Sequence, residues 1–390
     1  MYPALTVLAQ LKDEMTSQPG SALTALPREK QGDRQPTLTT LWVGGVGGME
    51  ANLVRREGIA FEEIPAAGIA GVGRDLPKNL WQLSRGYAAS RRILRRFQPE
   101  VLFFTGGFLA VPVALAARAP GLNFRRPRSL LYVPDIEPGL ALKSITRFSD
   151  AIAVTAEEAL AYFPKHTRVR VTGYPVRPGL RAWAAKSREE ARQALGLPSE
   201  MPLLLVTGGS RGALSVNQAL LRALPDLLKM GLVVHITGER DWPEMEAGWG
   251  EISSGLDPEV AARYRAFPYL HAEMGAALAA ADLVISRAGA SALGEYPLFG
   301  LPAVLIPYPH AWRYQQVNAR YLESRGAAQI VQDADLTSEL LPAVSRLLAD
   351  LEKLQAMSAA MRSLARPGAG AEIGALLMEL AQGPESADHG

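Results

Sequence analysis

The sequence contains no cysteine and only five histidines. Without thiols the chain cannot form disulfides, thiolate zinc sites or a cysteine nucleophile, and five scattered histidines leave little for a metal site. We therefore expect neither a metal nor a cofactor. No run approaches the roughly twenty apolar residues that cross a bilayer, and the chain does not open with a charged-then-apolar signal. These absences predict a protein that acts from the cytoplasm.

The 390 residues are 48% hydrophobic, which is more apolar chain than one core usually absorbs. Apolar, β-branched runs alternate with helical stretches, a pattern typical of parallel sheets wound with helices. The expected strands are 38–43, 101–105, 129–133, 151–155, 169–172, 203–207, 233–237, 283–286 and 303–306. The fold class is therefore predicted to be α/β with two domains.

The Pro-Val-Arg-Pro-Gly run within 174–181 breaks the periodicity and predicts the domain boundary. We expect a first domain at 1–180 and a second at 181–365. Residues 366–390 are expected to form a terminal helix that returns to the first domain and then a frayed tail. Residues 17–37 are rich in Pro, Gly, Ser and charge, which predicts a mobile insertion.

Charge is divided unevenly along the chain. Residues 1–180 hold 23 Lys and Arg against 15 Asp and Glu, whereas residues 181–390 hold 18 against 24. A basic first half favours an anionic partner such as a membrane surface. The alternative is two independently soluble domains whose charges carry no functional meaning.

A glycine-rich turn, Thr-Gly-Gly-Ser-Arg-Gly-Ala at 207–213, lies between an expected strand and an expected helix. Free backbone N–H groups and the helix dipole favour an anion there, so a diphosphate fits with the Ser210 hydroxyl as a further donor. The alternative is a tight structural turn without a ligand. The chain has no Gly-Lys-Ser/Thr phosphate loop, which disfavours P-loop kinases and ATPases.

Two further strand ends carry candidate binding groups. After the strand 283–286, the turn 287–290 leads into a helix that places Glu295 about one and a half turns along, where a carboxylate can bind a ribose diol. After the strand 303–306, the amides of Gln315 and Asn318 can read sugar hydroxyls. The alternatives are a solvated surface glutamate and a helix turn that caps itself. Segments 105–108 and 133–139 are expected to line the opposite wall of a cleft.

The order of these motifs resembles that of the MurG family, the peripheral membrane glycosyltransferases of bacterial peptidoglycan synthesis in glycosyltransferase family 28. The matching residues are Tyr-Pro-Ala-Leu at 2–5, 43–45 through 48–50, 106–107, 138–139, Gly-Tyr-Pro-Val-Arg at 173–177, 208–210, 287–290 with Glu295, and Gln315 with 318–319. The resemblance implies a GT-B fold, in which two Rossmann-like domains face a cleft. It also implies transfer of N-acetylglucosamine from UDP-GlcNAc to undecaprenyl-diphosphate-MurNAc-pentapeptide (lipid I), giving lipid II with inversion.

The resemblance implies roles for individual residues. Arg177 and Ser210 would meet the diphosphate, Glu295 the ribose, Gln315 the donor sugar, and the backbone at Leu270 and His271 the uracil. The nucleoside-binding turn would consist of Ala290, Ser291, Ala292, Leu293, Gly294 and Glu295. The family's His-Glu-Gln-Asn segment reads Tyr-Val-Pro-Asp at 132–135 here, so that Asp135 alone keeps a polar group on the acceptor wall.

In family members a first strand, a glycine loop, a general-base histidine and a valine precede Tyr-Pro-Ala-Leu. In this sequence Met1 occupies the position of that valine, so the strand, the loop and the histidine are not part of residues 1–390. We therefore expect a first domain without its central strand, and no catalytic residue between 1 and 390. An internal GTG codon taken as the start is the hypothesis that explains this.

The resemblance also implies a peripheral position on the cytoplasmic face of the bacterial cell membrane, other cell-wall synthesis enzymes as partners, and no nucleic acid. A basic helical stretch at 80–97 carries Arg85, Arg91, Arg92, Arg95 and Arg96, and Ile69, Val72, Leu76, Leu80 and Trp81 precede or begin it. Such a stretch suits docking on anionic lipid, although a solvated helix face is the alternative. Two other functions remain open: a diacylglycerol glycosyltransferase and an inactive UDP-sugar- or lipid-binding scaffold.

Overall fold

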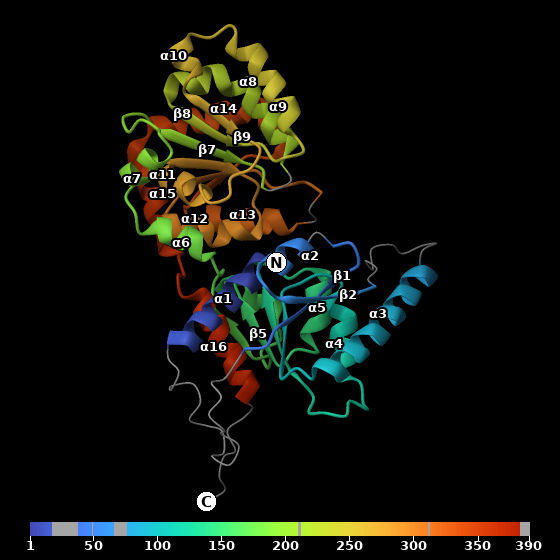
Figure 1. Cartoon of the computed structure of the whole chain (residues 1–390). Coiled ribbons are helices and arrows are strands. Elements are labelled where there is room, and N and C mark those ends of the chain that lie inside the picture. Colours follow the sequence, from blue (N-terminus) through green and yellow to red (C-terminus); the bar gives the residue numbers. More distant parts are fainter. Residues whose placement is uncertain (18–37, 49, 66–75, 210–211, 311–312, 383–390) are drawn as a thin grey trace, which may run out of the picture. The chain divides into compact units, whose positions relative to one another are not determined.

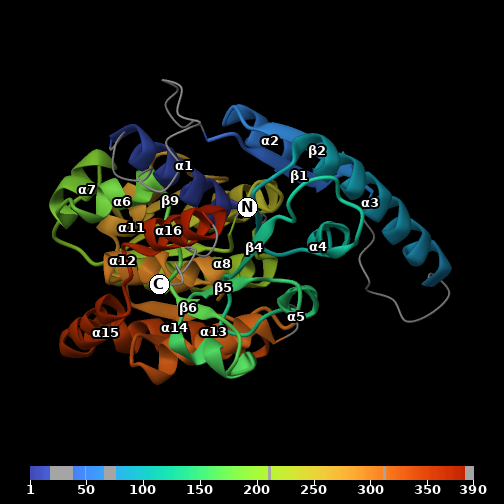
Figure 2. The same ribbon diagram turned by 90° about the horizontal axis from the view of Figure 1, so that it is seen from below.

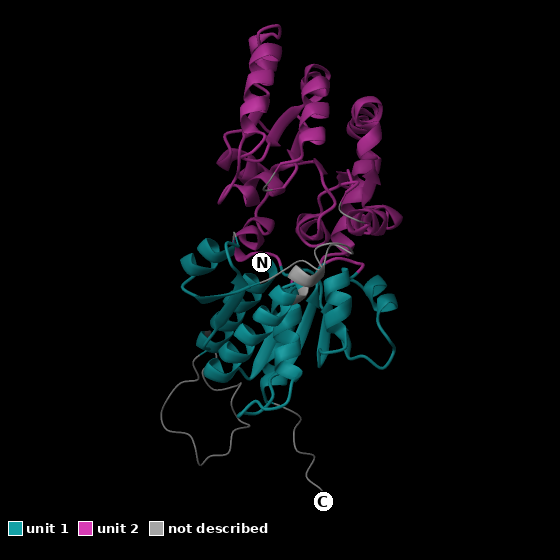
Figure 3. Ribbon diagram, turned by 90° about the vertical axis from the view of Figure 1, so that its right-hand side faces the viewer, with its two compact units in different colours: residues 1–134, 138–175, 368–390 teal, residues 135–137, 176–367 magenta. Residues whose placement is uncertain are grey.

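The computed structural model describes the chain except for residues 18–37, 49, 66–75, 210–211, 311–312 and 383–390. It divides into two compact α/β units (Figure 3). Unit 1 comprises Met1–Pro134, Pro138–Pro175 and Gly368–Gly390, and unit 2 comprises Asp135–Glu137 and Val176–Pro367. The expected insertion at 17–37 lies outside the described residues except for Ser17, which ends the first helix, and so does the tail after Gln382.

Unit 1 holds two parallel sheets (Figures 1 and 2). The smaller pairs β1 (Leu41–Gly45) with β2 (Ala60–Ile64). The larger has the order β3-β4-β5-β6. Its strands are β3 (Val101–Phe104), β4 (Arg128–Val133), β5 (Ala151–Val154) and β6 (Val169–Val171).

Side chains alternate across β4 and so build two cores. Leu130 and Tyr132 pack with α1 (Tyr2–Ser17) and α16 (Ala369–Gln382), whereas Leu131 and Val133 pack on the opposite face with α4 (Ala110–Arg118) and α5 (Leu140–Thr146). The remaining helices in the described part of unit 1 are α2 (Glu50–Arg56), α3 (Leu76–Phe97) and η2 (Glu157–Tyr162).

Unit 2 holds one six-stranded parallel sheet of order β12-β11-β10-β7-β8-β9. Its strands are β7 (Leu203–Thr207), β8 (Leu232–Ile236), β9 (Tyr264–Phe267), β10 (Leu283–Ser286), β11 (Ala303–Leu305) and β12 (Ala328–Ile330). Every residue of β7, β8 and β10 is buried, as expected for a parallel sheet covered on both faces.

Two helices of unit 2, α8 (Leu214–Met230) and α14 (Leu336–Ala349), pack together over one face of this sheet. The others are α6 (Pro178–Ala184), α7 (Arg188–Ala194), α9 (Trp242–Ser253), α10 (Pro258–Ala261), α11 (Met274–Ala280), η3 (Ala290–Leu293), α12 (Glu295–Phe299), α13 (Tyr314–Ser324), η4 (Asp333–Asp335) and α15 (Leu351–Ser363). No helix in the described part of the chain has the length and apolar character needed to cross a bilayer.

Candidate functional site

The predicted donor-binding groups gather at one edge of the unit 2 sheet. The turns that follow β7, β10 and β11 leave adjacent parallel strands in the same direction. Because the carboxyl ends of parallel strands share one edge, these three turns are neighbours. Ligands of open α/β sheets bind at this edge, so the topology supports a common site.

The turn after β7 requires its glycines. Gly212 has φ +79°, and a Cβ there would lie 2.5 Å from the Thr237 carbonyl oxygen. A Cβ on Gly208 would lie 2.4 Å from the backbone nitrogen of Ala213. The N-cap residue Ala213 has no side chain that can accept a hydrogen bond from the first N–H groups of α8, which leaves these groups without a cap from that residue. Ser210 lies outside the described residues, and its contact with a diphosphate stays a prediction.

A buried polar network supports this turn from beneath. Asn217 donates from Nδ2 to the Thr237 carbonyl (2.9 Å) and to Asp241 Oδ2 (3.1 Å). Its Oδ1 lies 3.0 Å from His235 Nε2, so Nε2 must carry the proton, and His235 Nδ1 accepts from the Tyr264 hydroxyl at 2.8 Å. Burial lowers the pKa of His235 to about 3, which keeps the ring neutral.

This network was not predicted from the sequence. Asn217 stands in an otherwise apolar helix face and His235 in an otherwise apolar strand. Their positions in the sequence could have indicated a buried pair of polar residues. Asp241 Oδ2 would lie 2.6 Å from a Cβ on Gly212. The network is therefore in contact with the glycine turn and holds its position relative to β8.

Glu295 lies at the same edge, but in a different setting from the one predicted. The expected continuous helix after Gly289 is wrong, because the chain forms the short 3₁₀ helix η3, breaks at Gly294 and starts α12 at Glu295. Pro297 explains the break, since it fits the first turn of a helix but not the interior of one starting at residue 290.

The Glu295 carboxyl is nearly enclosed, with 13% of the side chain exposed. Burial raises its pKa to about 7, and Arg177, whose Nη2 lies 3.8 Å from Oε1, opposes the shift. Arg177 immediately precedes α6. The structure thus brings together two residues that are 118 positions apart in sequence and that were predicted to bind the same nucleotide.

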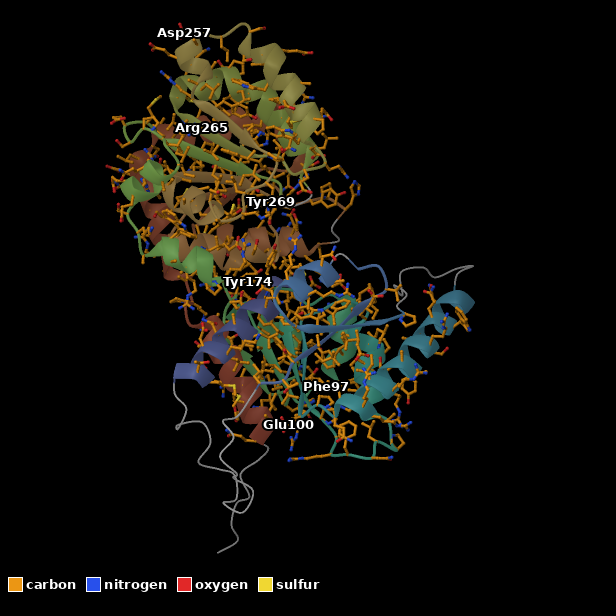
Figure 4. The ribbon with its side chains drawn as sticks, in the orientation of Figure 1. Phe97, Glu100, Tyr174, Asp257, Arg265 and Tyr269 are labelled. Atoms are coloured by element: carbon orange, nitrogen blue, oxygen red, sulfur yellow. The ribbon has the colours of Figure 1, made fainter. Side chains whose placement is uncertain are left out.

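The other predicted residues of this turn differ in what they can offer. Ala292 and Leu293 bury their side chains at 2% and 5% exposure, so only their backbone could meet a ligand. Ala290, Ser291 and Gly294 are half-buried. His271 is exposed in the loop after β9, with its ring edge-on to Tyr269 at 4.6 Å between centroids (Tyr269 is labelled in Figure 4). A uracil contact there stays a prediction.

Gln315 and Asn318 both lie on α13 but are not equivalent. Gln315 Oε1 accepts from the Tyr308 N–H at 2.9 Å, which orients the amide and leaves its Nε2 hydrogens as donors. Asn318 is fully buried. Its Oδ1 accepts from the Ile136 N–H, and its Nδ2 donates to Asp135 Oδ1 and the Ala288 carbonyl. The expectation that Asn318 reads sugar hydroxyls is therefore wrong.

Asp135 belongs to unit 2, together with Ile136 and Glu137. Burial raises the pKa of Asp135, and the hydrogen bond from Asn318 Nδ2 (2.8 Å) opposes that shift. Arg313 donates from Nε and Nη2 to the two carboxylate oxygens of Glu137 at 2.6 and 2.8 Å. This three-residue segment is thus fixed to α13 through Asn318 and to the residue before that helix, Arg313.

Tyr132 was expected on an acceptor wall, and this is also wrong. The side chain is completely buried, and its hydroxyl lies 3.0 Å from Thr155 Oγ1 and donates to the Gly173 carbonyl at 3.2 Å. Its position in the middle of the alternating β4 pattern places it in the core between the sheet and α16.

Arg287 is likewise a structural residue, because its hydrogen bonds connect three turns of unit 2. It donates to Asp333 Oδ1 (2.5 Å), to the Ile306 carbonyl (3.2 Å) and to Ser215 Oγ (2.8 Å). Ser215 lies in the first turn of α8, and Ile306 follows β11. Arg287 therefore ties the turns after β7, β10 and β11 to one another. Among the described residues, no group of three His, Asp or Glu is placed to hold a metal ion.

Comparison with known proteins identifies the family. Residues 203–370 match the glycosyltransferase family 28 C-terminal domain, and residues 33–124 match the N-terminal domain. The chain is 38% identical to the UDP-N-acetylglucosamine–N-acetylmuramyl-(pentapeptide) pyrophosphoryl-undecaprenol N-acetylglucosamine transferase of Roseiflexus sp. (strain RS-1), across 97% of this chain and 92% of that protein. The chain belongs to glycosyltransferase family 28.

A second relative supports the same placement. This family 28 glycosyltransferase is 40% identical to the transferase of the same name from Desulforudis audaxviator (strain MP104C), across 86% of this chain and 88% of that protein. Its fold is similar to that of the crystal structure of Acinetobacter baumannii MurG, with a TM-score of 0.70, 22% identity, and coverage of 96% and 95% of the two chains. The two Rossmann-like α/β units are those of the GT-B class, as the sequence predicted.

Proposed function

We propose that this chain transfers N-acetylglucosamine from UDP-GlcNAc to the lipid-linked acceptor undecaprenyl-diphosphate-MurNAc-pentapeptide, forming lipid II. The observation that carries the proposal is 38–40% identity, over most of the chain, to transferases named for this reaction. The grouping of Glu295, Arg177 and Gln315 at one sheet edge with the glycine turn supports the donor half of it.

The donor would lie along this edge. The glycine turn with Ser210, the start of α8 and Arg177 bind the diphosphate, because backbone N–H groups and a guanidinium favour an anion. Glu295 accepts from the ribose hydroxyls. Gln315 donates from Nε2 to the sugar, since Tyr308 already occupies its Oε1. The uracil meets the backbone near His271, with the turn 290–294 beneath the nucleoside.

The reaction is a single displacement. The acceptor 4-hydroxyl oxygen forms a bond to the sugar C1, the bond from C1 to the diphosphate oxygen breaks, and UDP leaves with the electron pair. Arg177 and the α8 N-terminus stabilise the negative charge that develops on the leaving group. The hydroxyl proton passes to a base, and none of the donor-binding residues is assigned that role. Asp135 is the proposed polar contact to the acceptor.

Membrane association is proposed through α3. Trp81 is 58% exposed, and the Arg85 guanidinium stacks 4.7 Å from its ring centroid, so an aromatic and a basic group stand together on the surface. Such pairs suit the interface of an anionic bilayer. Ile69 and Val72, and the side chains of Leu76 and Leu80, lie outside the described residues.

Radiolabelled UDP-GlcNAc tests the function with lipid I and with diacylglycerol as separate acceptors. Transfer of the label to lipid I, which gives labelled lipid II, supports the proposal. Transfer to diacylglycerol alone would instead show that the chain is a glycolipid synthase. UDP binding without transfer to either acceptor indicates a UDP-sugar-binding scaffold. Co-sedimentation with phosphatidylglycerol vesicles at low and high salt tests the membrane contact, which is rejected if no binding occurs at low salt.

A further inference from the structure

An open, charged cavity lies on the surface of unit 1, away from the carboxyl ends of its strands. It has a volume of about 350 Å³ and is lined by Arg125, Arg126, Arg128 and Asp150. Arg128 is the first residue of β4, and Asp150 immediately precedes β5. Figure 4 labels Glu100, just before β3, and Tyr174, after β6, at opposite ends of this sheet. The cavity is at the Glu100 end.

The segment that carries two of these arginines is firmly held. Arg91 donates to the carbonyls of Ala119, Pro120 and Gly121 at 2.9–3.2 Å, and Arg95 donates to Gly121 at 3.2 Å. Leu122 and Phe124 pack against the small apolar cluster of Leu94, Ala116 and Ala117. The backbone on either side of Arg125 and Arg126 is therefore anchored, because Pro127 is also buried.

The single carboxylate in the lining is already engaged. Asp150 Oδ2 accepts from the Ser129 N–H (2.8 Å), the Ser129 hydroxyl (2.9 Å) and Arg118 Nη2 (3.3 Å), while Arg126 Nη2 is 4.0 Å from Oδ1. Arg125 and Arg128 make no ion pair within the described part of the chain. Glu100, whose carbonyl accepts from the Arg128 N–H, makes none there either.

Three arginines thus line one cavity with a single carboxylate, that of Asp150. This carboxylate also accepts a hydrogen bond from a fourth arginine, Arg118. Like charges in such proximity repel, and an anion with several negative charges removes that repulsion. Planar guanidinium groups bind phosphate oxygens in pairs, which makes arginine the usual residue for phosphate recognition. A volume of about 350 Å³ is at the lower end of small-molecule sites.

We propose that this cavity is a binding site for a small phosphate-bearing anion, separate from the donor site of unit 2. Arg125 and Arg126, which are exposed, approach the anion from the loop, and Arg128 approaches it from β4. The hydrogen bonds of Asp150 Oδ2 with Ser129 and Arg118 hold this lining residue in place. The lining includes neither Glu295 nor a residue of the glycine turn.

Calorimetric titration of the full chain with inorganic phosphate and with pyrophosphate, at constant ionic strength, tests the site. We expect saturable binding that is at least tenfold weaker in Arg125→Glu. Arg56→Glu makes the same charge change on the exposed face of α2, where Arg56 has no partner among the described residues, and should bind as the unchanged protein does. Arg125→Gln and Arg126→Gln keep the test valid if charge reversal prevents folding.

Three results would overturn the proposal. The first is equal binding by Arg125→Glu and Arg56→Glu. The second is loss of the Arg125-dependent binding when UDP is saturating, because the anion would then occupy the donor site. The third is Arg125-dependent sedimentation with phosphatidylglycerol vesicles without Arg125-dependent binding of free phosphate, which assigns the arginines to lipid headgroups. None of these readouts uses glycosyl transfer, so the outcome is independent of the proposed reaction.

Discussion

Arg177 Nη2 lies 3.8 Å from Glu295 Oε1, in a setting where burial nevertheless raises the pKa of the carboxyl to about 7. The attraction of the guanidinium therefore offsets only part of the cost of removing the carboxylate from water. Glu295 is a group whose ionised form destabilises the folded chain, and its proposed role on the ribose gives a functional reason for its presence.

Replacing Glu295 with glutamine should separate stability from binding. Between pH 4.5 and 7 the folded chain retains a proton that the unfolded chain releases, so the Glu295 contribution to stability falls as pH rises through that window. Glu295→Gln should therefore be more stable than the unchanged protein at pH 8, by about 1–3 kcal/mol, and should bind UDP about tenfold more weakly. Urea unfolding at pH 5 and 8 and UDP calorimetry measure the two effects. Unchanged UDP affinity would refute the assignment of Glu295.

Gln315 allows its two functions to be tested separately. Gln315→Glu keeps an oxygen that accepts from the Tyr308 N–H but removes both amide donors, whereas Gln315→Leu removes both functions. We expect kcat/KM for UDP-GlcNAc to fall by one to two orders of magnitude in each variant, because one lost hydrogen bond to a polar substrate group costs about 1–3 kcal/mol. The melting temperature should fall in Gln315→Leu alone. If Gln315→Glu transfers sugar at the normal rate, the amide donors do not bind it.

Asn318 should be a stability residue and not a binding residue. Asn318→Asp places a second carboxylate against Asp135 and the Ala288 carbonyl, where the amide now donates to both. We expect a loss of about 2–4 kcal/mol in unfolding free energy at pH 7. Asn123→Asp, the same change on an exposed residue, should cost little. Equal stability of the two variants in urea would contradict the hydrogen bonds at Asn318.

His235 should make the chain sensitive to acid. Its pKa is about 3 when folded against 6.5 when exposed, so the unfolded chain binds a proton that the folded chain excludes, and stability is lost as pH falls from 6.5 toward 3. Glu295 acts in the opposite direction between pH 7 and 4.5. In the background of Glu295→Gln, the unfolding free energy should therefore fall by up to about 1.4 kcal/mol per pH unit below pH 6.

A matched pair of variants isolates this slope. Adding His235→Gln to Glu295→Gln should flatten the slope, although the chain loses some stability at every pH. Adding His310→Gln instead, at an exposed ring beside Tyr308, should leave the slope as it was. Identical slopes with and without His235 would show that the ring is not held neutral.

All nine strands expected from the sequence are present, with ends shifted by up to three residues. The three strands that were not expected, β2, β9 and β12, each lie at the end of a sheet. Two glutamates stand in β2 and an arginine in β9. Edge strands expose one side to water and tolerate such residues, so they lack the apolar run that made the central strands recognisable.

The candidate site was predictable where local sequence determines it. In the sequence, an apolar run typical of a strand, a group of glycines and a helical pattern follow one another directly, and together they predict the glycine turn. Asn318 was not predictable, because the groups that occupy its amide, Asp135 and Ile136, lie more than 180 residues earlier. The same holds for Tyr132, whose hydroxyl is bonded to a carbonyl 41 residues away. Long-range partners decide whether a polar side chain is available to a ligand.

The division of the unit 1 strands between two sheets has a consequence for the behaviour of the protein in solution. Within the described residues, unit 1 presents four strand edges, on β1, β2, β3 and β6, where the single sheet of unit 2 presents two. Unpaired N–H and C=O groups along an edge can pair with another polypeptide. Among the strand amides, exchange should accordingly be fastest on β1, β2, β3 and β6, and association between molecules should begin at the edges of these strands.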